Sequence, residues 1–530
     1  MKLIYNVEDK PKFGRKIIFA FQQLLAIMAA TIAVPAIVGN GMSSAAALFG
    51  AGVGTLVYIL FTKKKSPVFL GSSFAFIDSM AAAFAGAATI GLGYLGLIIG
   101  AAFAGLVYVI LAGLVKLVGV KWINKLMPAV VIGPTVAIIG LSLAGNAVAD
   151  FQKSDVAGGN TYLCMACGLV TLFVTMLCSS YGKKVGKLIP FIFGIFAGYA
   201  VAASLTIYGM ITGNASLQII DFAPMQDLFS DGVKVNSIVT TSLDHFVFLK
   251  GFGAIGEINL SYIITLAVAY VPVAFVVFAE HIADHKNLSS IIERDLLSEP
   301  GLSRTLLGDG IGSVAGAFFG GCPNTTYGES VGCVAITKNA SVSTIIAAAV
   351  LAIVVSFISP FVAFLDSIPA CLMGGVCIAL YGFIAVSGLK MVQKVNLNDN
   401  KNLFVVSVVL ITGIGGLSLN ISGIKVTSIA CALILGIITN LLLRKSKGED
   451  DMTPAAEDVD EIGNIEAVEA VLNADDVELT VEAVAQDAEP IAEEAAEETV
   501  EASEEVAEAV QDAEQTVEEA AEETVKLDAE

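Results

Sequence analysis

Charged side chains are scarce in this sequence, and their scarcity decides the class of protein. Only 15% of the 530 residues are Asp, Glu, Lys or Arg, while 56% are hydrophobic. Soluble domains average about 25% charged and about 45–50% apolar residues, and the mean hydropathy here is +0.79. The composition argues against a water-soluble enzyme, a nucleic-acid-binding protein and a secreted disulfide scaffold.

Histidine and cysteine are also few, and they form no metal-binding pattern. The chain has three His and eight Cys, and the cysteines lie in apolar stretches. Cys164 and Cys167 are separated by two residues, but no further ligands lie near them in the sequence. They are interpreted as small apolar packing residues, and the sequence predicts no metal and no cofactor. His245, in a long loop, is interpreted as a surface residue.

Acidic residues are sparse in most of the chain but dominate its end. Residues 449–530 hold 31 of the 50 acids and a single base, Lys526, which gives them a net charge of −30. The preceding residues hold the other 19 acids and 28 bases, a net charge of +9. The tail is rich in Ala and Val but has no apolar face wide enough for a core. This composition predicts an acidic, disordered cytoplasmic tail that solvates the chain; a regulatory or partner-binding role is the alternative.

Apolar stretches long enough to cross a bilayer, which takes about 20 residues, recur up to residue 443. The third and the tenth are the weakest, because both are short and interrupted by Gly and Ser. The sequence predicts an all-α polytopic membrane protein with a cytoplasmic N-terminus at 1–15 and a transporter body at 16–448. Its 14 predicted transmembrane segments are 16–38, 43–62, 66–84, 88–117, 126–148, 161–180, 187–212, 260–284, 303–321, 322–337, 341–365, 367–389, 401–420 and 424–443.

The basic residues follow the predicted segments in a regular alternation. Four bases between residues 10 and 16 precede the first segment, and every even-numbered segment ends on a basic loop. Positive loops face the cytoplasm, so both termini are expected on the cytoplasmic side of the cell inner (cytoplasmic) membrane. No cleavable signal is apparent. Leaving out the two weak segments would break the alternation. The loop bases include Lys63, Lys64, Lys65, Lys121, Lys125, Lys183, Lys184, Lys187, Lys286, Arg294, Arg304, Lys338, Lys390, Lys394, Lys401, Arg444, Lys445 and Lys447.

Two short patterns recur in the same order in the two halves of the body. Gly residues at 50, 52 and 54 return at 308, 310 and 312, and Pro-Ala-x3-Gly at 128–133 returns at 369–374. Repeats of about 16–212 and 260–443 would contain seven segments each, so the second would be inverted relative to the first. Transporters of this kind bind their substrate between broken helices in matching positions. The sequence therefore places the site at residues 69–76 and 321–330.

Ionisable groups inside spanning segments are costly and mark functional sites. Glu280 and Asp284 share one face of a helix, and His281 and His285 share the next. Glu329 lies inside the second broken segment. Two inward carboxyl groups suit a small polar ligand with N–H donors. Because burial disfavours the charged form of a carboxyl group, either acid offers a route to proton coupling.

Four motifs resemble the nucleobase–ascorbate transporter (nucleobase:cation symporter) family, and most closely its bacterial uracil permease branch. The resemblance covers residues 12–444. The motifs are Gly71-Ser-Ser-Phe-Ala-Phe76, Ala279-Glu280-His281, Pro300-Gly301, and Asn324-Thr-Thr-Tyr-Gly-Glu329, which runs on to Gly332 and Thr337-Lys338.

This resemblance implies a 7+7 inverted repeat with interleaved core and gate domains and short strands in segments 3 and 10. It implies proton-coupled uptake of uracil by alternating access, and a possible homodimer through the gate domain. Glu280 and Glu329 would bind the pyrimidine ring. The other implied site residues are Phe74 and Gly328 through their backbones, Tyr327 and Ala30 as pocket lining, and Tyr381 as support.

Three positions depart from the family pattern. A histidine of the first segment is replaced by Gln23, the signature asparagine is Ser330, and Asp284 stands where some relatives have a histidine, with His285 displaced by one residue. These departures leave open whether Glu280 or Glu329 carries the coupling proton. Xanthine or another nucleobase is the alternative cargo. A channel-like anion pathway, which two buried acids disfavour, and an intramembrane enzyme with paired carboxylates are more remote alternatives.

Overall fold

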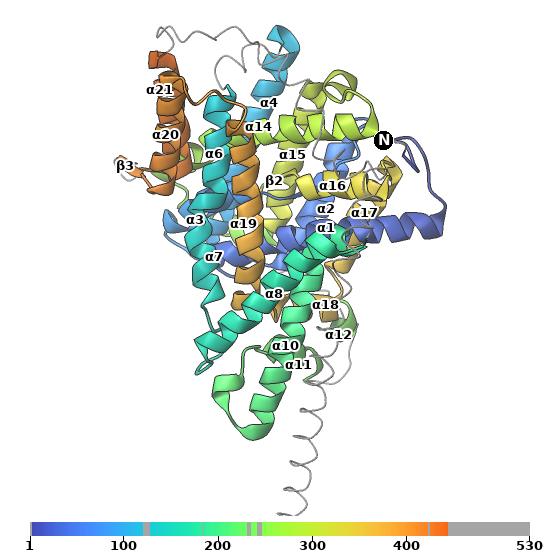
Figure 1. The fold of residues 1–530 in the computed structure, drawn as a ribbon. Coiled ribbons are helices and arrows are strands. Elements are labelled where there is room, and N and C mark those ends of the chain that lie inside the picture. The colour runs from blue at the N-terminus through green and yellow to red at the C-terminus, as the bar shows by residue number, and fades with distance from the viewer. Residues whose placement is uncertain are drawn as a thin grey trace, which may run out of the picture. The chain divides into compact units, whose positions relative to one another are not determined.

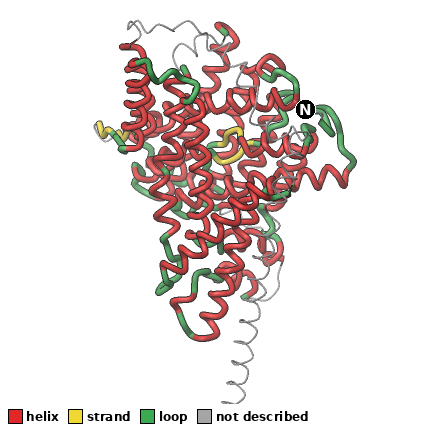
Figure 2. Tube along the Cα trace, viewed as in Figure 1, coloured by secondary structure: helices red, strands yellow, loops and turns green. Residues whose placement is uncertain are grey.

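The computed structural model describes residues 3–119, 128–183, 185–230, 235–240, 246–421 and 424–443. Helices make up most of this part of the chain, together with four strands of three residues (Figures 1 and 2). The acidic tail, His245, Lys121 and Lys125 lie outside the described residues, so the expectations for them remain predictions.

The segments of the first half follow the predicted order. They are α1 (Phe13–Val38), α2 (Ser44–Phe61), β1 (Leu70–Ser72) with η1 (Phe74–Phe76) and α3 (Ile77–Ala85), α4 (Ile90–Val118), α6 (Ala129–Ser142) with α7 (Ala144–Phe151), α8 (Thr161–Tyr181) and α10 (Pro190–Thr212).

The second half contains seven corresponding segments. They are α14 (Leu260–Ile292), α15 (Leu302–Gly320), β2 (Asn324–Thr326) with α16 (Gly328–Thr337), α17 (Val342–Val355) with α18 (Ser359–Asp366), α19 (Ala370–Val392), α20 (Asn400–Ile414) and α21 (Ser428–Leu442). Short connecting elements are α9 (Val185–Leu188), η2 (Ala215–Leu217), α11 (Ala223–Phe229), α12 (Val235–Ile238), α13 (Val247–Phe252), η3 (Ile255–Glu257), η4 (Leu297–Gly301), β3 (Leu419–Ile421) and β4 (Ile424–Val426).

Two predicted boundaries were wrong, and two predicted segments contain a break. The eighth segment does not end at residue 284, because α14 continues for two further turns to Ile292. The thirteenth ends as a helix at Ile414, and part of its predicted remainder is strand β3. The fifth and eleventh are each divided into two helices, α6 with α7 and α17 with α18. Hydropathy defines where apolar residues lie, but it does not locate a break between two apolar helices.

Several of the long helices begin with a side chain that caps their first turn. Ser43 accepts a hydrogen bond from Ala46 N at the start of α2, and Asn259 accepts one from Tyr262 N at the start of α14. Such caps satisfy backbone donors that have no partner within the helix. The segments thus capped are α2, α4, α8, α14, α20 and α21.

The chain is a multi-pass membrane protein. Eight helices in the described part of the chain are long and apolar enough to cross a bilayer, and four shorter helices are also apolar. Large apolar side chains remain exposed on their outer faces, such as Leu117 at 83% and Ile211 at 78%. These side chains would be unfavourable in water and are suited to contact with lipid.

Contacts between segments repeat when the two halves are exchanged. Segment 2 packs on segment 9 (α2 on α15), and segment 5 packs on segment 12 (α6 on α19). The packing of segment 1 on 11 (α1 on α17) is matched by that of segment 8 on 4 (α14 on α4). The packing of segment 6 on 7 (α8 on α10) is matched by that of 13 on 14 (α20 on α21). This correspondence, with an odd number of segments per half, confirms the predicted 7+7 inverted repeat.

Segments 3 and 10 meet through their strands, as the family resemblance implied. Strands β1 and β2 are antiparallel, with Leu70 opposite Thr326 and Ser72 opposite Asn324. Ser73 N donates to Pro323 O at 2.9 Å and extends the ladder. Figure 2 shows this pair of strands surrounded by helices. The ladder therefore joins the two repeats at the broken segments.

Repeated glycines allow α2 and α15 to cross at very short range. A Cβ on Gly50 would lie 2.4 Å from Gly316 O, and one on Gly54 would lie 2.7 Å from Gly312 O. Asn324 occupies the remaining space and donates from Nδ2 to Gly50 O at 3.0 Å. The close approach of the two helices at this crossing thus requires the repeated glycines. The Asn324 hydrogen bond also fixes the start of β2 against α2.

Candidate functional site

Each strand of the β1–β2 pair leads into a helix, so the site is built from two helix starts. Element η1 begins at Phe74, two residues after β1, and α16 begins at Gly328, two residues after β2. The first N–H groups of a helix have no acceptor within it and carry the positive end of the helix dipole. The two repeats therefore each present hydrogen-bond donors close to the same ladder.

The residues around β1 hold these helix starts in place. Thr55 of α2 accepts a hydrogen bond from Leu70 N at 2.9 Å. The Tyr327 hydroxyl donates to Ser72 O at 2.6 Å, and the Tyr327 ring lies so close to Gly71 that a Cβ there would be 2.3 Å from it. Tyr327 is 5% exposed. It is thus a buried link between the strands, as well as a neighbour of the α16 start.

Helix α14 presents carboxyl groups and imidazoles on separate faces, as the helical spacing predicted. Glu280 and Asp284 are partly accessible, whereas His281 and His285 are fully buried. Asp284 accepts a hydrogen bond from the Thr326 hydroxyl at 2.8 Å. Asp284 therefore faces strand β2 and is part of the site region rather than of a solvated helix end.

The carboxyl groups of α14 and α16 lie close together. Glu280 is near enough to Asp284 and Glu329 for electrostatic interaction with both. Glu329 is the second residue of α16 and is partly accessible, and Gly328 beside it is exposed. A ligand in this region would meet carboxyl acceptors from α14 and α16 and backbone donors from the helix starts.

Two residues that depart from the family pattern bond to each other. Gln23 Nε2 donates to Ser330 Oγ at 2.6 Å, and Ser330 Oγ also accepts from Phe69 N at 3.0 Å. Gln23 and Ser330 are both buried. The Gln23 amide thus connects α1 to α16 and the residue before β1, which supports the Glu329 backbone.

The two remaining predicted residues lie around the same elements. Tyr381 of α19 packs its ring against Phe74 in an edge-to-face contact, with centroids 5.8 Å apart. Ala30 is buried in α1, a helix that packs against both β1 and α16. The structure thus brings together the predicted residues from α1, η1, α14 and α16, with Tyr381 contributed from α19.

The imidazole face of α14 contacts an acid of α15 that the sequence reasoning missed. His281 Nδ1 lies 2.8 Å from Oδ2 of Asp309, a buried residue of α15. His285 Nε2 lies 2.6 Å from the hydroxyl of Tyr58 in α2. Asp309 sits between two of the repeated glycines, and its charge inside a spanning segment was the signal that could have identified it.

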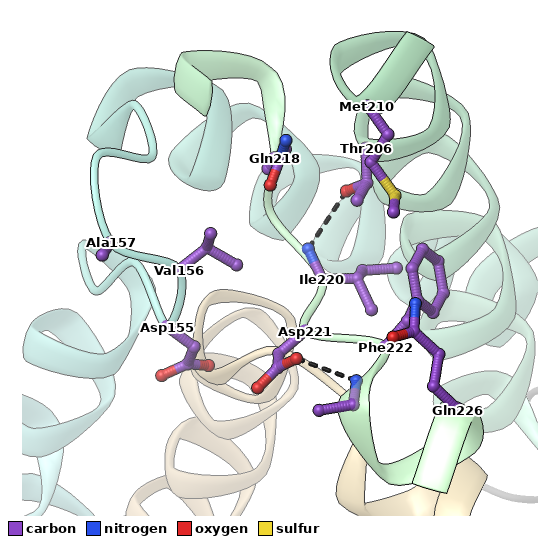
Figure 3. Close-up of a pocket in the computed structure, with 11 residues that line it drawn as sticks. Asp155, Val156, Ala157, Thr206, Met210, Gln218, Ile220, Asp221, Phe222 and Gln226 are labelled. Carbon is purple, nitrogen blue, oxygen red and sulfur yellow. Dashed lines mark hydrogen bonds between the residues drawn. The ribbon is translucent and has the colours of Figure 1, made fainter. Parts of the chain in front are cut away.

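A cavity of about 330 Å³ lies away from these residues, beside α10 and the loops that precede α8 and α11. It is lined by Asp155, Thr206, Gln218, Asp221 and others (Figure 3). Asp221 caps the start of α11 through Ala223 N, so one of its oxygens serves the backbone. In the described part of the chain, no group of three or more His, Cys, Asp or Glu residues is arranged to hold a metal ion.

Comparison with known proteins identifies the family. Residues 14–421 match the model of the Permease family. This chain belongs to that family. Uracil permease of Bacillus subtilis (strain 168) is 36% identical over 84% of this chain and 97% of its own length. Uracil permease of Bacillus caldolyticus is 38% identical over 83% of this chain and 95% of its own length.

The fold also occurs in a solved transporter of different sequence. The transmembrane domain of the cyanobacterial bicarbonate transporter BicA matches 82% of this chain and all of its own length, with a TM-score of 0.56 and 15% identity. The family, the fold class and the multi-pass membrane character agree with the sequence-based predictions. The protein is a membrane transporter rather than an enzyme.

Proposed function

We propose that the protein takes up uracil together with protons. The observation that carries this proposal is that backbone donors from both repeats lie near carboxyl acceptors of the second repeat. Backbone donors begin at Phe74 and Gly328, and carboxyl acceptors are provided by Glu280 and Glu329. A uracil ring has two carbonyl acceptors and two N–H donors, and this set can satisfy both kinds. The uracil permeases among the relatives support the same cargo.

In the proposed complex, Glu280 and Glu329 accept hydrogen bonds from the ring N–H groups. The N–H groups at Phe74 and Gly328 donate to the ring carbonyls, and Ala30 and Tyr327 line the pocket. Tyr381 supports Phe74 through the ring contact described above. A site built to pair with such groups discriminates strongly against ligands that leave them unpaired.

Proton coupling would use the carboxyl groups of this region. Glu280, Asp284 and Glu329 lie close together. Neighbouring carboxylates repel one another, and this repulsion is relieved when one of them binds a proton. Asp284 is held by Thr326, so it is a candidate beside the two glutamates. The side chains that would hold these carboxyl groups in position are those of His281, His285, Gln23 and Ser330.

Transport would proceed by alternating access between two groups of helices. Segments 1–4 and 8–11 would form the core domain, and segments 5–7 and 12–14 would form the gate domain, through which a homodimer would assemble. Helices α1 and α14 contact members of both groups. Both termini would face the cytoplasm, an orientation that reporter fusions at each end would test in the inner membrane.

Uptake of labelled uracil into proteoliposomes, with and without an inward proton gradient, tests the proposal. We expect gradient-stimulated uptake. Its absence from correctly folded protein would contradict the proposed function. Glu329→Gln should abolish uracil binding, because an amide nitrogen cannot replace both acceptor oxygens; unchanged binding would remove Glu329 from the site. Competition by excess xanthine would show whether the cargo is xanthine instead.

A further inference from the structure

His281 lies on the face of α14 next to that of Glu280 and Asp284, and its buried partner, Asp309 of α15, has no role in the proposed site. His281 Nδ1 and Asp309 Oδ2 are 2.8 Å apart, and the two side chains are 0% and 1% exposed. His281 Nε2 lies 3.0 Å from the Thr305 hydroxyl oxygen. Both nitrogens of the ring are therefore engaged with α15.

The hydrogen bonds of Thr305 decide which proton the imidazole carries. The Thr305 hydroxyl donates its only hydrogen to Leu302 O at 3.0 Å. Its oxygen must then accept from His281 Nε2, because a hydroxyl supplies one donor. Nε2 therefore bears a hydrogen. One further proton lies between Nδ1 and Asp309, either on the carboxyl group or on the ring.

The second oxygen of Asp309 indicates where that proton lies. Oδ1 is buried and has no hydrogen-bond partner within the described residues. An ionised carboxylate would leave this charged oxygen uncompensated, which is far more costly than leaving a neutral carbonyl oxygen unpaired. The carboxyl group therefore holds the proton on Oδ2 and donates it to Nδ1. Both partners are then neutral.

We propose that Asp309 is a neutral carboxylic acid that donates to His281 Nδ1, and that this pair positions α14 rather than carrying the transported proton. The second half of this inference rests on the proposed transport function. His281 directly follows Glu280, so bonding its ring to α15 sets the rotation of α14 about its axis. That rotation turns Glu280 and Asp284 toward α16.

A second anchor one turn further along α14 acts in the same way. His285 Nδ1 donates to His281 O at 2.8 Å, and its Nε2 bonds to Tyr58, which in turn bonds to Ser66 at 2.7 Å. The two imidazole rings are stacked with centroids 4.0 Å apart.

The groups that face the pair come from α2, α4 and α14. Tyr58 of α2 and Tyr108 of α4 interact electrostatically with Asp309, and Glu280 and Asp284 do so from α14. The His285 ring is stacked on that of His281. No Lys or Arg is among these groups, so they provide no permanently charged base that would stabilise an ionised Asp309.

The variants Asp309→Asn and Asp309→Ala distinguish a role of Asp309 in positioning α14 from a role in carrying the transported proton. The Asn amide can donate N–H to Nδ1 in place of the carboxyl O–H, so we expect gradient-driven uracil uptake and its pH profile to persist in D309N. D309A leaves Nδ1 without a donor, and we expect its uptake to fall roughly tenfold or more, because a buried acceptor loses its hydrogen bond. Binding of uracil is measured in parallel.

Two outcomes of this experiment would overturn the proposal. If D309N binds uracil but loses stimulation by the proton gradient, Asp309 is a proton carrier. If D309A transports as well as the wild type, the pair does not position α14.

An infrared measurement tests the protonation of Asp309 without any transport. The wild type minus D309N difference spectrum should contain the carbonyl stretch of a protonated carboxyl group. Glu299→Gln, which removes an exposed carboxyl group paired with Lys65, should not remove this band. Should D309N fail to fold, ¹³C-aspartate labelling of Asp284→Asn protein would identify the same band. Its absence would refute a neutral Asp309, whether or not the protein transports uracil.

Discussion

Tyr327 shows how much of the site depends on contacts between residues that are distant in the sequence. Its ring packs on Gly71, and its hydroxyl bonds to Ser72 O, 255 residues away. Gly71 leaves the space that this ring occupies. The glycine of the first broken segment is therefore required by an aromatic residue of the second.

Replacing Gly71 with Ala should displace Tyr327, because the new Cβ would lie 2.3 Å from the ring. We expect Gly71→Ala to weaken uracil binding, measured by equilibrium binding of labelled uracil to purified protein. Gly332→Ala is a suitable control, since a Cβ at that helical position would meet no atom within 4 Å. Equal loss of binding in both variants would contradict this assignment.

Thr326 and Thr325 provide a matched pair for testing Asp284. Thr326 donates to Asp284 at 2.8 Å, whereas the buried Thr325 hydroxyl has no partner in the described part of the chain. A carboxylate that loses a donor holds a proton more firmly. We expect Thr326→Val to move the pH profile of uptake to higher pH and Thr325→Val to leave it unchanged. A profile that is unaffected in Thr326→Val would show that Asp284 does not take part in coupling.

At the scale of single residues, the sequence predicted which face of a helix a side chain occupies, but not which residues that side chain contacts. The helical period separated Glu280 and Asp284 from His281 and His285 correctly, because both sets lie on one helix. The partners could not be predicted by spacing, since Thr326 is 42 residues from Asp284 and Ser330 is 307 residues from Gln23. Such contacts arise only when the two repeats are packed together.

At the scale of elements, the crossing of α2 and α15 is a tight contact between the repeats that also holds the start of β2. We expect Gly54→Ala to lower the midpoint of thermal unfolding in detergent, because its Cβ would lie 2.4 Å from Asn324 Nδ2 and overpacking costs about 1–3 kcal/mol. Gly113→Ala in α4 should have little effect, since no atom lies within 4 Å of that position. A similar midpoint in both variants would mean that the crossing relaxes freely.

The N-terminal residues before α1 form a second such contact on the expected cytoplasmic side. Val7 is buried, and Ala340 N and Val342 N donate to Tyr5 O and Val7 O. Glu8 is paired with Arg294, whose hydrogen bond holds the pKa of Glu8 below its ordinary value.

This pair makes a pH-dependent contribution to stability. A lowered acid pKa stabilises the fold above the ordinary value and loses that effect as the pH falls through the lowered one. Because both side chains are about half exposed, the effect is small, roughly 1 kcal/mol or less. We expect the unfolding midpoints of wild type and Glu8→Gln to differ slightly at neutral pH and to converge in acid. A difference that is constant with pH would contradict this account.

The elements themselves were predictable to different degrees. Long apolar runs identified twelve of the fourteen segments, because a spanning helix must satisfy its own backbone and remain apolar. The alternation of basic loops supported the third and the tenth. The strands were implied only by the family resemblance, since three residues are too few to display an alternating pattern. The breaks in segments 5 and 11 were missed for a related reason: the residues on both sides are equally apolar.

At the scale of the whole molecule, the net charge of −21 combines two opposite parts. The residues up to 448 carry +9, and residues 449–530 carry −30. We expect a chain truncated after residue 448 to transport uracil at the wild-type rate, because the candidate site lies wholly within the family match. It should also bind vesicles with anionic lipids more strongly, since the acidic tail would repel them. Loss of uptake in the truncated chain would assign the tail a role in transport.

The mutual packing of the repeats has a consequence for the order in which the protein is made. Asn324, which completes the α2–α15 crossing, follows Gly50 by 274 residues. At a synthesis rate of about 5–20 residues per second, α2 would wait roughly 14–55 s for its partner. During that time its glycine face must be covered by lipid or by other helices of the first repeat. The first repeat therefore enters the membrane as an unfinished half, and the binding site exists only after the ribosome has passed the second.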